Sequence, residues 1–337
     1  MASNDTPYAF VYATNNPADE VPIGKEDFDR IKPSAEHVLA VQEIEDLYDM
    51  LVNAVWKFDQ VFFRYADLAR FVSGLYELFY QKRQEINSAS VEVFYILPMF
   101  LDYQTDNPHV KHEPVPQLET ESAIRKCKAL RNYLQHVGTF PMTITDRSMM
   151  CAQKVDFSSI RFTMFRREFD LQRLKPKTRQ DFESQFPEDA EIDLYEVVSH
   201  GVDVISRFVV DVRALPFFNG EYAQCKEFLE KISSRTFEVG KICLRYADGI
   251  ERKGRDAIIP YLANENIKRI EALRRRHLCR PVSKLYVTNA PNEFLDSCSR
   301  VFMTAEVCQQ RFMEARPNMK PAAAPSPEGT VEKKDVP

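Results

Sequence analysis

Apolar residues repeat at helical spacing over long stretches, and this pattern constrains the fold more than any other feature of the chain. Between residues 34 and 84, large apolar side chains recur every three or four positions. They are Ile44, Leu47, Leu51, Val55, Phe58, Val61, Phe62, Tyr65, Leu68, Val72, Leu75 and Phe79. This spacing places them along one face of a helix. Because a single globular helix is rarely so long, we expect two helices here.

The same spacing predicts more helices along the chain. They cover residues 87–103, 120–137, 176–186, 192–214, 221–248, 255–277 and 292–314. Ser34, which follows a proline, resembles an N-terminal helix cap, and Thr120 or Ser122 resembles another. Pro98 should bend or end the helix that contains it. Gly138 should end the helix over 120–137.

The segment from 140 to 170 has a different pattern. Residues 142–145 (Met-Thr-Ile-Thr) favour a strand, and residues 160–164 (Ile-Arg-Phe-Thr-Met) alternate with the period of two that is typical of strands. We therefore predict a mainly α protein with a small β-hairpin insertion at about 140–170. Only 9 glycines occur in 337 residues, which argues against many tight hairpins and against Gly-rich nucleotide loops.

Composition divides the chain into four segments. Residues 1–24 are polar and irregular, and residues 317–337 are rich in Pro and Ala and then charged, so we expect both to be disordered. Between them we expect a helical domain over 25–215, which carries the β insertion. We expect residues 216–316 to form a C-terminal helical extension that packs on that domain.

Charge and cysteine content indicate the compartment and the kinds of partner. The net charge of −5 provides no general attraction to nucleic acid or to an anionic membrane. There is no apolar run long enough for a transmembrane helix and no apolar core of a secretion signal near Met1. The 7 cysteines are scattered without C-x-x-C spacing, which is typical of a reduced, cytoplasmic protein without a zinc site.

One hexapeptide combines the residue types that can cleave RNA without a metal: Arg131-Asn132-Tyr133-Leu134-Gln135-His136. An arginine can hold phosphate oxygens through its planar fork of donors. A histidine, with an ordinary pKa of about 6.5, can take a proton from a ribose 2′-hydroxyl. The hexapeptide lies near the end of a predicted helix, where the helix dipole favours a charged histidine.

Helix geometry limits what these side chains can do together. Positions five apart are about 140° apart around a helix, so Arg131 and His136 do not share a face, whereas Asn132 and His136 do. Both could reach one phosphate if the helix bent at His136, or if a two-fold dimer brought two copies of the hexapeptide together. From the residues alone, a purely structural interpretation stays open, because arginine and histidine are both favoured in the last turn of a helix.

The stretch from Leu130 to Gly138, within a protein of long helices, resembles the R-x4-6-H signature of the HEPN superfamily, in which a polar residue follows the arginine. The resemblance implies an α-helical bundle that dimerises, here over 25–215. It implies metal-independent endoribonuclease activity, which many members have, with Arg131, Asn132 and His136 paired across the dimer. Many members are toxins or effectors of phage defence or stress. The hairpin and the helices after about 215 lie outside the minimal bundle.

The expected function is therefore RNA cleavage by 2′-OH attack, which leaves a 2′,3′-cyclic phosphate and a 5′-hydroxyl. His136 would act as base or acid, Arg131 would stabilise the phosphate, and Asn132 would orient the site. No cofactor is expected. The expected partners are RNA, a second copy of the chain and an antitoxin or regulatory protein, with no membrane. The alternative is a non-catalytic helical module that binds RNA or protein.

Two basic segments are candidate RNA contacts. The first runs from residue 161 to residue 179 and contains seven basic residues, among them Arg161, Arg166 and Arg167, interleaved with phenylalanines. Seven acidic residues follow in 181–196, so simple charge compensation is an equal alternative. The second basic segment is Arg274, Arg275 and Arg276, which could equally form a solvated helix face.

The remaining histidines do not indicate a metal centre. His109 and His112 have no third or fourth ligand at a suitable spacing in the sequence, so no metal site is expected. His200 lies within a helical pattern beside Gly201 and should be packed or partly exposed.

Overall fold

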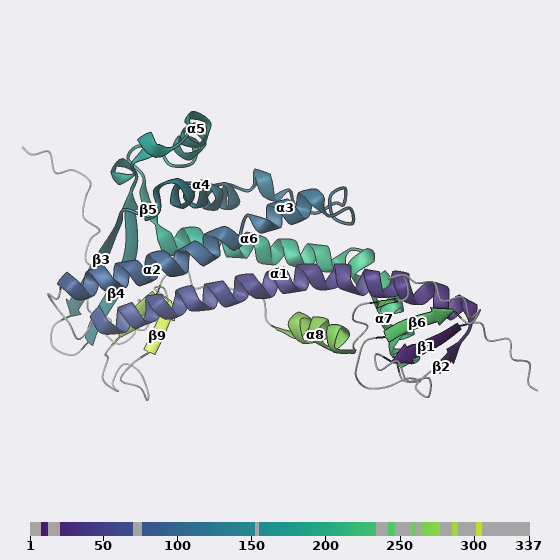
Figure 1. The fold of residues 1–337 in the computed structure, drawn as a ribbon. Helices are drawn as coiled ribbons and strands as arrows, with labels where there is room; N and C mark the ends of the chain where they lie inside the picture. Colours follow the sequence, from purple (N-terminus) through teal and green to yellow (C-terminus); the bar gives the residue numbers. More distant parts are fainter. Residues whose placement is uncertain are drawn as a thin grey trace, which may run out of the picture. The chain divides into compact units, whose positions relative to one another are not determined.

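Helices make up most of the chain that the computed structural model describes (Figure 1). The described residues are 8–12, 21–69, 76–151, 155–233, 242–246, 258–259, 264–276, 285–288 and 301–304. The α-helices are α1 (Lys25–Ala69), α2 (Tyr76–Ile96), α3 (Met99–Asp106), α4 (Ser122–Val137), α5 (Pro176–Gln185), α6 (Leu194–Ala214), α7 (Tyr222–Ser233) and α8 (Asn264–Arg275). The predicted mainly α class is confirmed.

Helix ends follow the sequence signals in part. Pro98 separates α2 from α3, as predicted. Gly138 ends α4 with φ at 101°, a conformation that favours glycine, and its N–H donates to Leu134 O at 2.9 Å. The predicted caps of α4 are wrong, because Glu121 occupies the cap position and no side chain caps the helix. The predicted start near Ser34 is also wrong: α1 begins at Lys25 and runs through Pro33.

The long first helix tolerates its internal proline because packing outweighs the lost hydrogen bond. A proline inside a helix removes one backbone donor and costs about 3 kcal/mol. Ile31, Ala35 and Val38, which flank Pro33, are all buried, and burying such side chains stabilises the helix by a comparable amount. Tertiary burial therefore outweighed the local sequence signal for a helix start at Pro33 and Ser34.

A first antiparallel sheet has the strand order β2-β1-β6-β7. Its strands are β1 (Tyr8–Tyr12), β2 (Val21–Ile23), β6 (Ile242–Tyr246) and β7 (Ile258–Ile259). The first two correct the prediction that 1–24 is irregular throughout, and β6 corrects the prediction of a helix over 221–248. β1 pairs with β6, more than 200 residues later in the chain. A pairing so distant in sequence leaves no trace in local periodicity.

The predicted hairpin region forms part of a second sheet. Strands β3 (Met142–Cys151) and β4 (Val155–Phe165) are neighbours in it, within the predicted range of about 140–170. The order is β3-β4-β8-β9, with β8 (Leu285–Thr288) and β9 (Val301–Thr304), and β5 (Glu191–Asp193) also pairs with β4. The strand β9 corrects the prediction of a helix over 292–314, because Val301–Thr304 pair antiparallel with β8.

The chain forms two compact units: Met1–Ile144 with Arg161–Pro281, and Thr145–Ile160 with Val282–Pro337. All eight helices named above belong to the first unit, which continues across residue 215; the predicted division there remains a prediction. Of the segments predicted to be disordered, residues 1–7, 13–20 and 317–337 lie outside the described residues. In the described part of the chain, no helix has both the length and the apolar character needed to cross a membrane.

A buried carboxylate joins three helices of the first unit. Glu45 of α1 is completely buried and accepts hydrogen bonds from Arg213 of α6 at 2.5 and 3.1 Å and from Arg274 of α8 at 2.7 Å. Arg274 also donates to Phe218 O at 2.9 Å. Two guanidinium groups therefore compensate one buried negative charge. Beside them, Arg269 of α8 and Arg276, which follows that helix, form ion pairs with more exposed acids of α1.

Replacing Glu45 should destabilise the fold strongly. Glu45→Gln removes the charge that both arginines face, so we expect the free energy of unfolding to fall by about 3 kcal/mol. Denaturant unfolding followed by circular dichroism measures this change. The control is Asp46→Asn, which removes the more exposed partner of Arg269 and should cost about 1 kcal/mol or less. Equal losses in the two variants would contradict the assignment.

A second carboxylate should make stability depend on pH. Burial raises the pKa of Asp59 in α1 from 3.8 to about 6, although Tyr195 Oη donates to it at 2.9 Å and partly opposes the rise. Between pH 4 and 6 the folded state therefore holds more protons than the unfolded state, and stability falls as the pH rises through this window. Well above pH 6 the loss should be about 3 kcal/mol.

Unfolding of the wild type and of Asp59→Asn, measured at pH 4 and pH 7, tests this expectation. The variant should gain stability relative to the wild type at pH 7 and lose most of that gain at pH 4. Tyr195→Phe, which removes the donor and keeps the ring, should steepen the fall with pH. A wild type whose stability rises from pH 4 to pH 7 relative to Asp59→Asn would contradict it.

Candidate functional site

An aromatic cluster fixes the helix that carries the hexapeptide. Tyr133 of α4 is buried, and its ring centroid lies 4.7 Å from that of Phe169 and 5.9 Å from that of Phe182 in α5. Its hydroxyl accepts a hydrogen bond from Asp170 N at 3.3 Å. The fourth ring, Phe140, follows the end of α4 and stacks on Tyr133 at 6.3 Å. The middle of the hexapeptide is therefore part of the core, and only its flanking residues can reach solvent.

A glycine lets α4 approach α6 closely. A Cβ atom on Gly201 of α6 would lie 2.7 Å from Cys127 Sγ of α4 and 3.2 Å from Leu97 Cδ1. The Cys127 thiol is buried and donates to Val197 O at 3.7 Å. Within this helical pattern, His200 is therefore exposed, whereas Gly201 lies where α6 crosses α4.

The three predicted site residues lie in the C-terminal half of α4. Arg131 and Asn132 are partly exposed, and His136 is exposed. Arg131 Nη1 donates to Asn132 Oδ1 at 3.2 Å, and Arg131 Cζ lies 5.5 Å from the ring centroid of Tyr95 in α2. Arg131 Nε is buried and has no hydrogen-bond partner among the described residues. The guanidinium group is therefore held between a ring and an amide, with one donor unused.

The helix does not bend at His136. Because α4 stays regular to Val137, Arg131 and His136 lie on different sides of it, as the spacing predicted. The amide oxygen of Asn132 accepts from Arg131, its neighbour, and not from His136. An orienting role of Asn132 for His136 therefore stays a prediction. Exposure of His136 leaves its imidazole accessible to a ligand or to another chain.

A pocket of about 370 Å³ adjoins one flank of the hexapeptide; we call it the α5 pocket. Its lining is Leu101, Glu119, Ile124, Arg125, Lys128, Ala129, Asn132, Lys177, Asp181, Ser184 and Gln185. Asn132 is the hexapeptide residue among them. Lys128 Nζ lies 3.6 Å from Glu119 Oε1, whereas the cations of Arg125 and Lys177 have no ion pair or hydrogen bond within the described residues.

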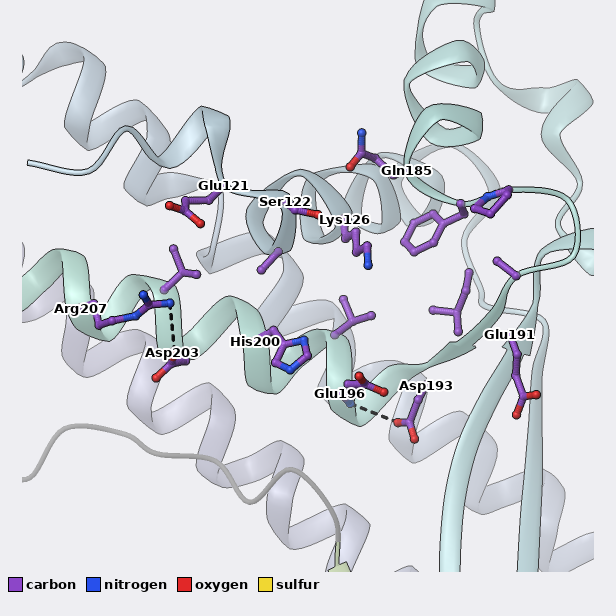
Figure 2. A pocket seen from close by; sticks show the side chains of 17 residues that line it. Glu121, Ser122, Lys126, Gln185, Glu191, Asp193, Glu196, His200, Asp203 and Arg207 are labelled. Atoms are coloured by element: carbon purple, nitrogen blue, oxygen red, sulfur yellow. Dashed lines mark hydrogen bonds and ion pairs between the residues drawn. The ribbon is translucent and has the colours of Figure 1, made fainter. Parts of the chain in front are cut away.

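A second pocket, of about 460 Å³, lies at the N-terminal ends of α4 and α6 and beside β5; we call it the β5 pocket (Figure 2). Lys126 of α4 and His200 of α6 lie on facing walls in Figure 2. Asp193 caps α6 by accepting from the N–H groups of Tyr195 and Glu196. No hexapeptide residue lines this pocket. Sequence patterns missed it because its walls come from segments far apart in the chain.

The arginines of the first predicted group of RNA contacts lie in different environments. Arg166 donates to Glu183 at 3.3 Å and lies over Phe182, which places it within the fold. Arg167 is exposed, with Cζ 5.3 Å from the ring centroid of Phe165. The side chain of Arg161 lies outside the described residues. Because Arg179 shares Glu183 with Arg166, charge compensation accounts for part of this basic segment.

The second predicted group is used largely for docking α8. Arg274 contacts the buried Glu45, and Arg276 forms an ion pair with Asp49 of α1. Arg275 is 78% exposed and lies 3.7 Å from Glu271. RNA contact by these arginines stays a prediction, and the geometry favours a role in α8 packing for the two that contact α1.

His109, one of the two histidines weighed as metal ligands, packs against an aromatic ring. His109 stacks on Phe217 at 3.6 Å, and His37 of α1 stacks on the same ring at 3.9 Å. Two rings cannot share one face at these distances, so Phe217 lies between them. His37 Nε2 also contacts Phe217 O at 2.8 Å. Within the described ranges, no group of three His, Cys, Asp or Glu side chains could hold a metal ion.

Comparisons with known proteins assign no family to the chain: no family model, no curated protein and no solved structure matches it.

The close approach at Gly201 can be tested by adding a methyl group. We expect Gly201→Ala to lower the free energy of unfolding by about 1–2 kcal/mol, because the new Cβ meets the buried Cys127 Sγ. Combining it with Cys127→Ala, which removes the sulfur, should restore part of the loss in denaturant unfolding. Gly220→Ala, where a Cβ meets nothing within 4 Å, is the matched control. Additive effects of the two α4–α6 substitutions would contradict the proposed contact.

Proposed function

We propose that this chain is a metal-independent endoribonuclease of HEPN type that acts as a homodimer. One observation carries the proposal. At the end of one helix, the exposed His136 follows a hydrogen-bonded Arg131–Asn132 pair whose arginine is partly exposed. An accessible imidazole and a preoriented arginine are the two groups that this cleavage chemistry requires.

The reaction uses a proton transfer and an internal attack. His136 takes the proton of a ribose 2′-hydroxyl, and the 2′-oxygen attacks the adjacent phosphorus. The bond from phosphorus to the 5′-oxygen breaks, and the leaving oxygen takes a proton from the protonated His136. The products are a 2′,3′-cyclic phosphate and a 5′-hydroxyl. Arg131 stabilises the negative charge that grows on the phosphate oxygens in the transition state, and Asn132 fixes the position of Arg131 through their hydrogen bond.

A second copy supplies the missing half of the site. Arg131 and His136 of one chain lie on different sides of a regular helix, so one phosphate cannot meet both in the same chain. Tyr95, whose ring lies under Arg131, is 40% exposed, and Met99 at the start of α3 is 42% exposed. Exposed apolar side chains next to the site fit a contact with another chain. A two-fold axis there would bring His136 of the partner subunit toward Arg131.

Two further expectations belong to this proposal by the HEPN resemblance alone. They are a role as a toxin or as an effector of phage defence or stress, and control by an antitoxin or regulatory protein. The second candidate function is a non-catalytic helical module that binds RNA or protein. The contact of the Arg131 guanidinium with Tyr95 and Asn132 favours it, because it gives the arginine a structural role.

RNA cleavage in the presence of EDTA tests the proposal. Wild-type protein should cleave a single-stranded RNA, and both Arg131→Ala and His136→Ala should lower the rate at least about 100-fold, because each removes a group that acts in the transition state. The matched control is His112→Ala, which removes an exposed histidine outside the site. Mass spectrometry of the products should detect the 2′,3′-cyclic phosphate.

Mixed dimers test whether the site is shared. Coexpression of Arg131→Ala and His136→Ala chains yields mixed dimers that hold one intact Arg131 and one intact His136. If these act across the two-fold axis, about a quarter of the sites regain activity. A lack of recovery would overturn the shared site. Activity that survives both substitutions would place catalysis elsewhere, and RNA binding without any cleavage would support the non-catalytic module.

A further inference from the structure

We propose that the α5 pocket is the RNA entry subsite of this protein. In this subsite Arg125 and Lys177 bind the backbone phosphates of a single-stranded RNA and lead it to His136. The inference rests on the proposed function, because it assigns the substrate path to the same helix. It adds a binding surface built from α3, α4 and α5. Lys177 lies within the basic segment from Arg161 to Arg179, whereas Arg125 belongs to neither basic segment.

The pocket and the hexapeptide share one face of α4. Arg125 and Asn132 both line the pocket and are seven positions apart, and His136 follows Asn132 by four. Residues at such spacings lie on one side of a helix. The eleven steps from Arg125 to His136 cover about 16 Å along the helix axis. A strand that enters the pocket and follows this face therefore reaches the exposed imidazole.

The charges of the pocket fit phosphate. Its three cations are Arg125, Lys128 and Lys177, and its acids are Glu119 and Asp181. Glu119 forms an ion pair with Lys128, so it is already compensated. The cations of Arg125 and Lys177 are exposed and have no ion pair or hydrogen bond to any described residue. Two cations with no assigned partner beside one carboxylate give a locally positive surface on a chain whose net charge is −5.

The lining also fits ribose and not a buried base. Leu101, Ile124 and Ala129 provide small apolar walls, and no aromatic ring of the described residues lines the pocket. Without a ring there is no stacking platform for bases, which is the usual source of base contact with single strands. Binding should thus depend on phosphate charge, on salt concentration and little on sequence.

The two flanks of the hexapeptide therefore have different tasks. On one side, Arg131 lies over the exposed Tyr95, where the proposed second copy binds. On the other side, Asn132 borders the α5 pocket, where the RNA enters. In the β5 pocket, five acids outnumber the two cations Lys126 and Arg207. The pocket therefore disfavours phosphate, so the basic path is specific to the α5 side of α4.

The test uses the full chain with His136→Ala, so that RNA is bound but not cleaved. Into it we introduce Arg125→Glu with Lys177→Glu. Both are exposed positions near helix N-termini, where glutamate is favoured. The matched control carries Lys32→Glu with Lys111→Glu, two exposed lysines elsewhere that change the net charge equally. Fluorescence anisotropy with a labelled single-stranded RNA measures Kd at several salt concentrations.

We expect the Arg125/Lys177 substitutions to raise Kd at least tenfold and to lower the salt slope by about 1.4, the value for two phosphate contacts on a single strand. The control should bind as the parent does. In the chain that retains His136, the same two substitutions should raise KM for RNA more than they lower kcat. A second RNA of different sequence should be affected equally.

The outcomes separate the inference from the proposed function. Wild-type cleavage with unchanged Kd in the Arg125/Lys177 variant would overturn the entry subsite and leave the nuclease intact. Loss of RNA binding in that variant, in a protein that never cleaves RNA, would support the subsite and overturn the nuclease. Equal losses in the variant and in the control would reduce the effect to net charge and overturn the subsite. Absence of RNA binding by the parent chain would overturn it as well.

Discussion

The ion pairs of the buried Glu45 carboxylate are the interactions on which the helical unit depends. Its negative charge lies at zero exposure and is compensated by Arg213 of α6 and by Arg274 of α8. A buried charge that loses such partners costs several kcal/mol, so removing one member of the cluster weakens the packing of all three helices. This constraint explains why Arg274 lies against α1, where Asp46 and Asp49 form ion pairs with Arg269 and Arg276.

The position of the candidate site depends on a second constraint, the packing of α4. Gly201 brings α6 within contact of Cys127, and the Tyr133 cluster holds α5 and the chain that follows α4. Together they bury the middle of the hexapeptide and leave its two ends accessible. Because the helix remains regular, Arg131 and His136 diverge, and this divergence is the physical reason to propose a site shared between two chains.

Sequence patterns predicted the elements of the fold correctly wherever local forces decide the structure. The mainly α class, the separation of α2 from α3 at Pro98, the glycine end of α4 and the hairpin region follow from periodicity, backbone chemistry and strand propensity. The errors share one cause. Pro33 lies inside a helix because its neighbours are buried, and β6 is a strand because it pairs with β1 from the other end of the described chain. Neither burial nor distant pairing is visible in a local window.

The sequence by itself determined the helical class, the hexapeptide and the divergence of Arg131 from His136, since these follow from residue type and the turn of a helix. Only the tertiary structure decided which charges are free. It placed Arg166 against Glu183 and Arg274 against Glu45, and it left Arg125 and Lys177 with no charged partner in the described structure, beside Asn132. The residue type determines the charge of a side chain. Whether that charge is compensated depends on neighbours that only folding brings together.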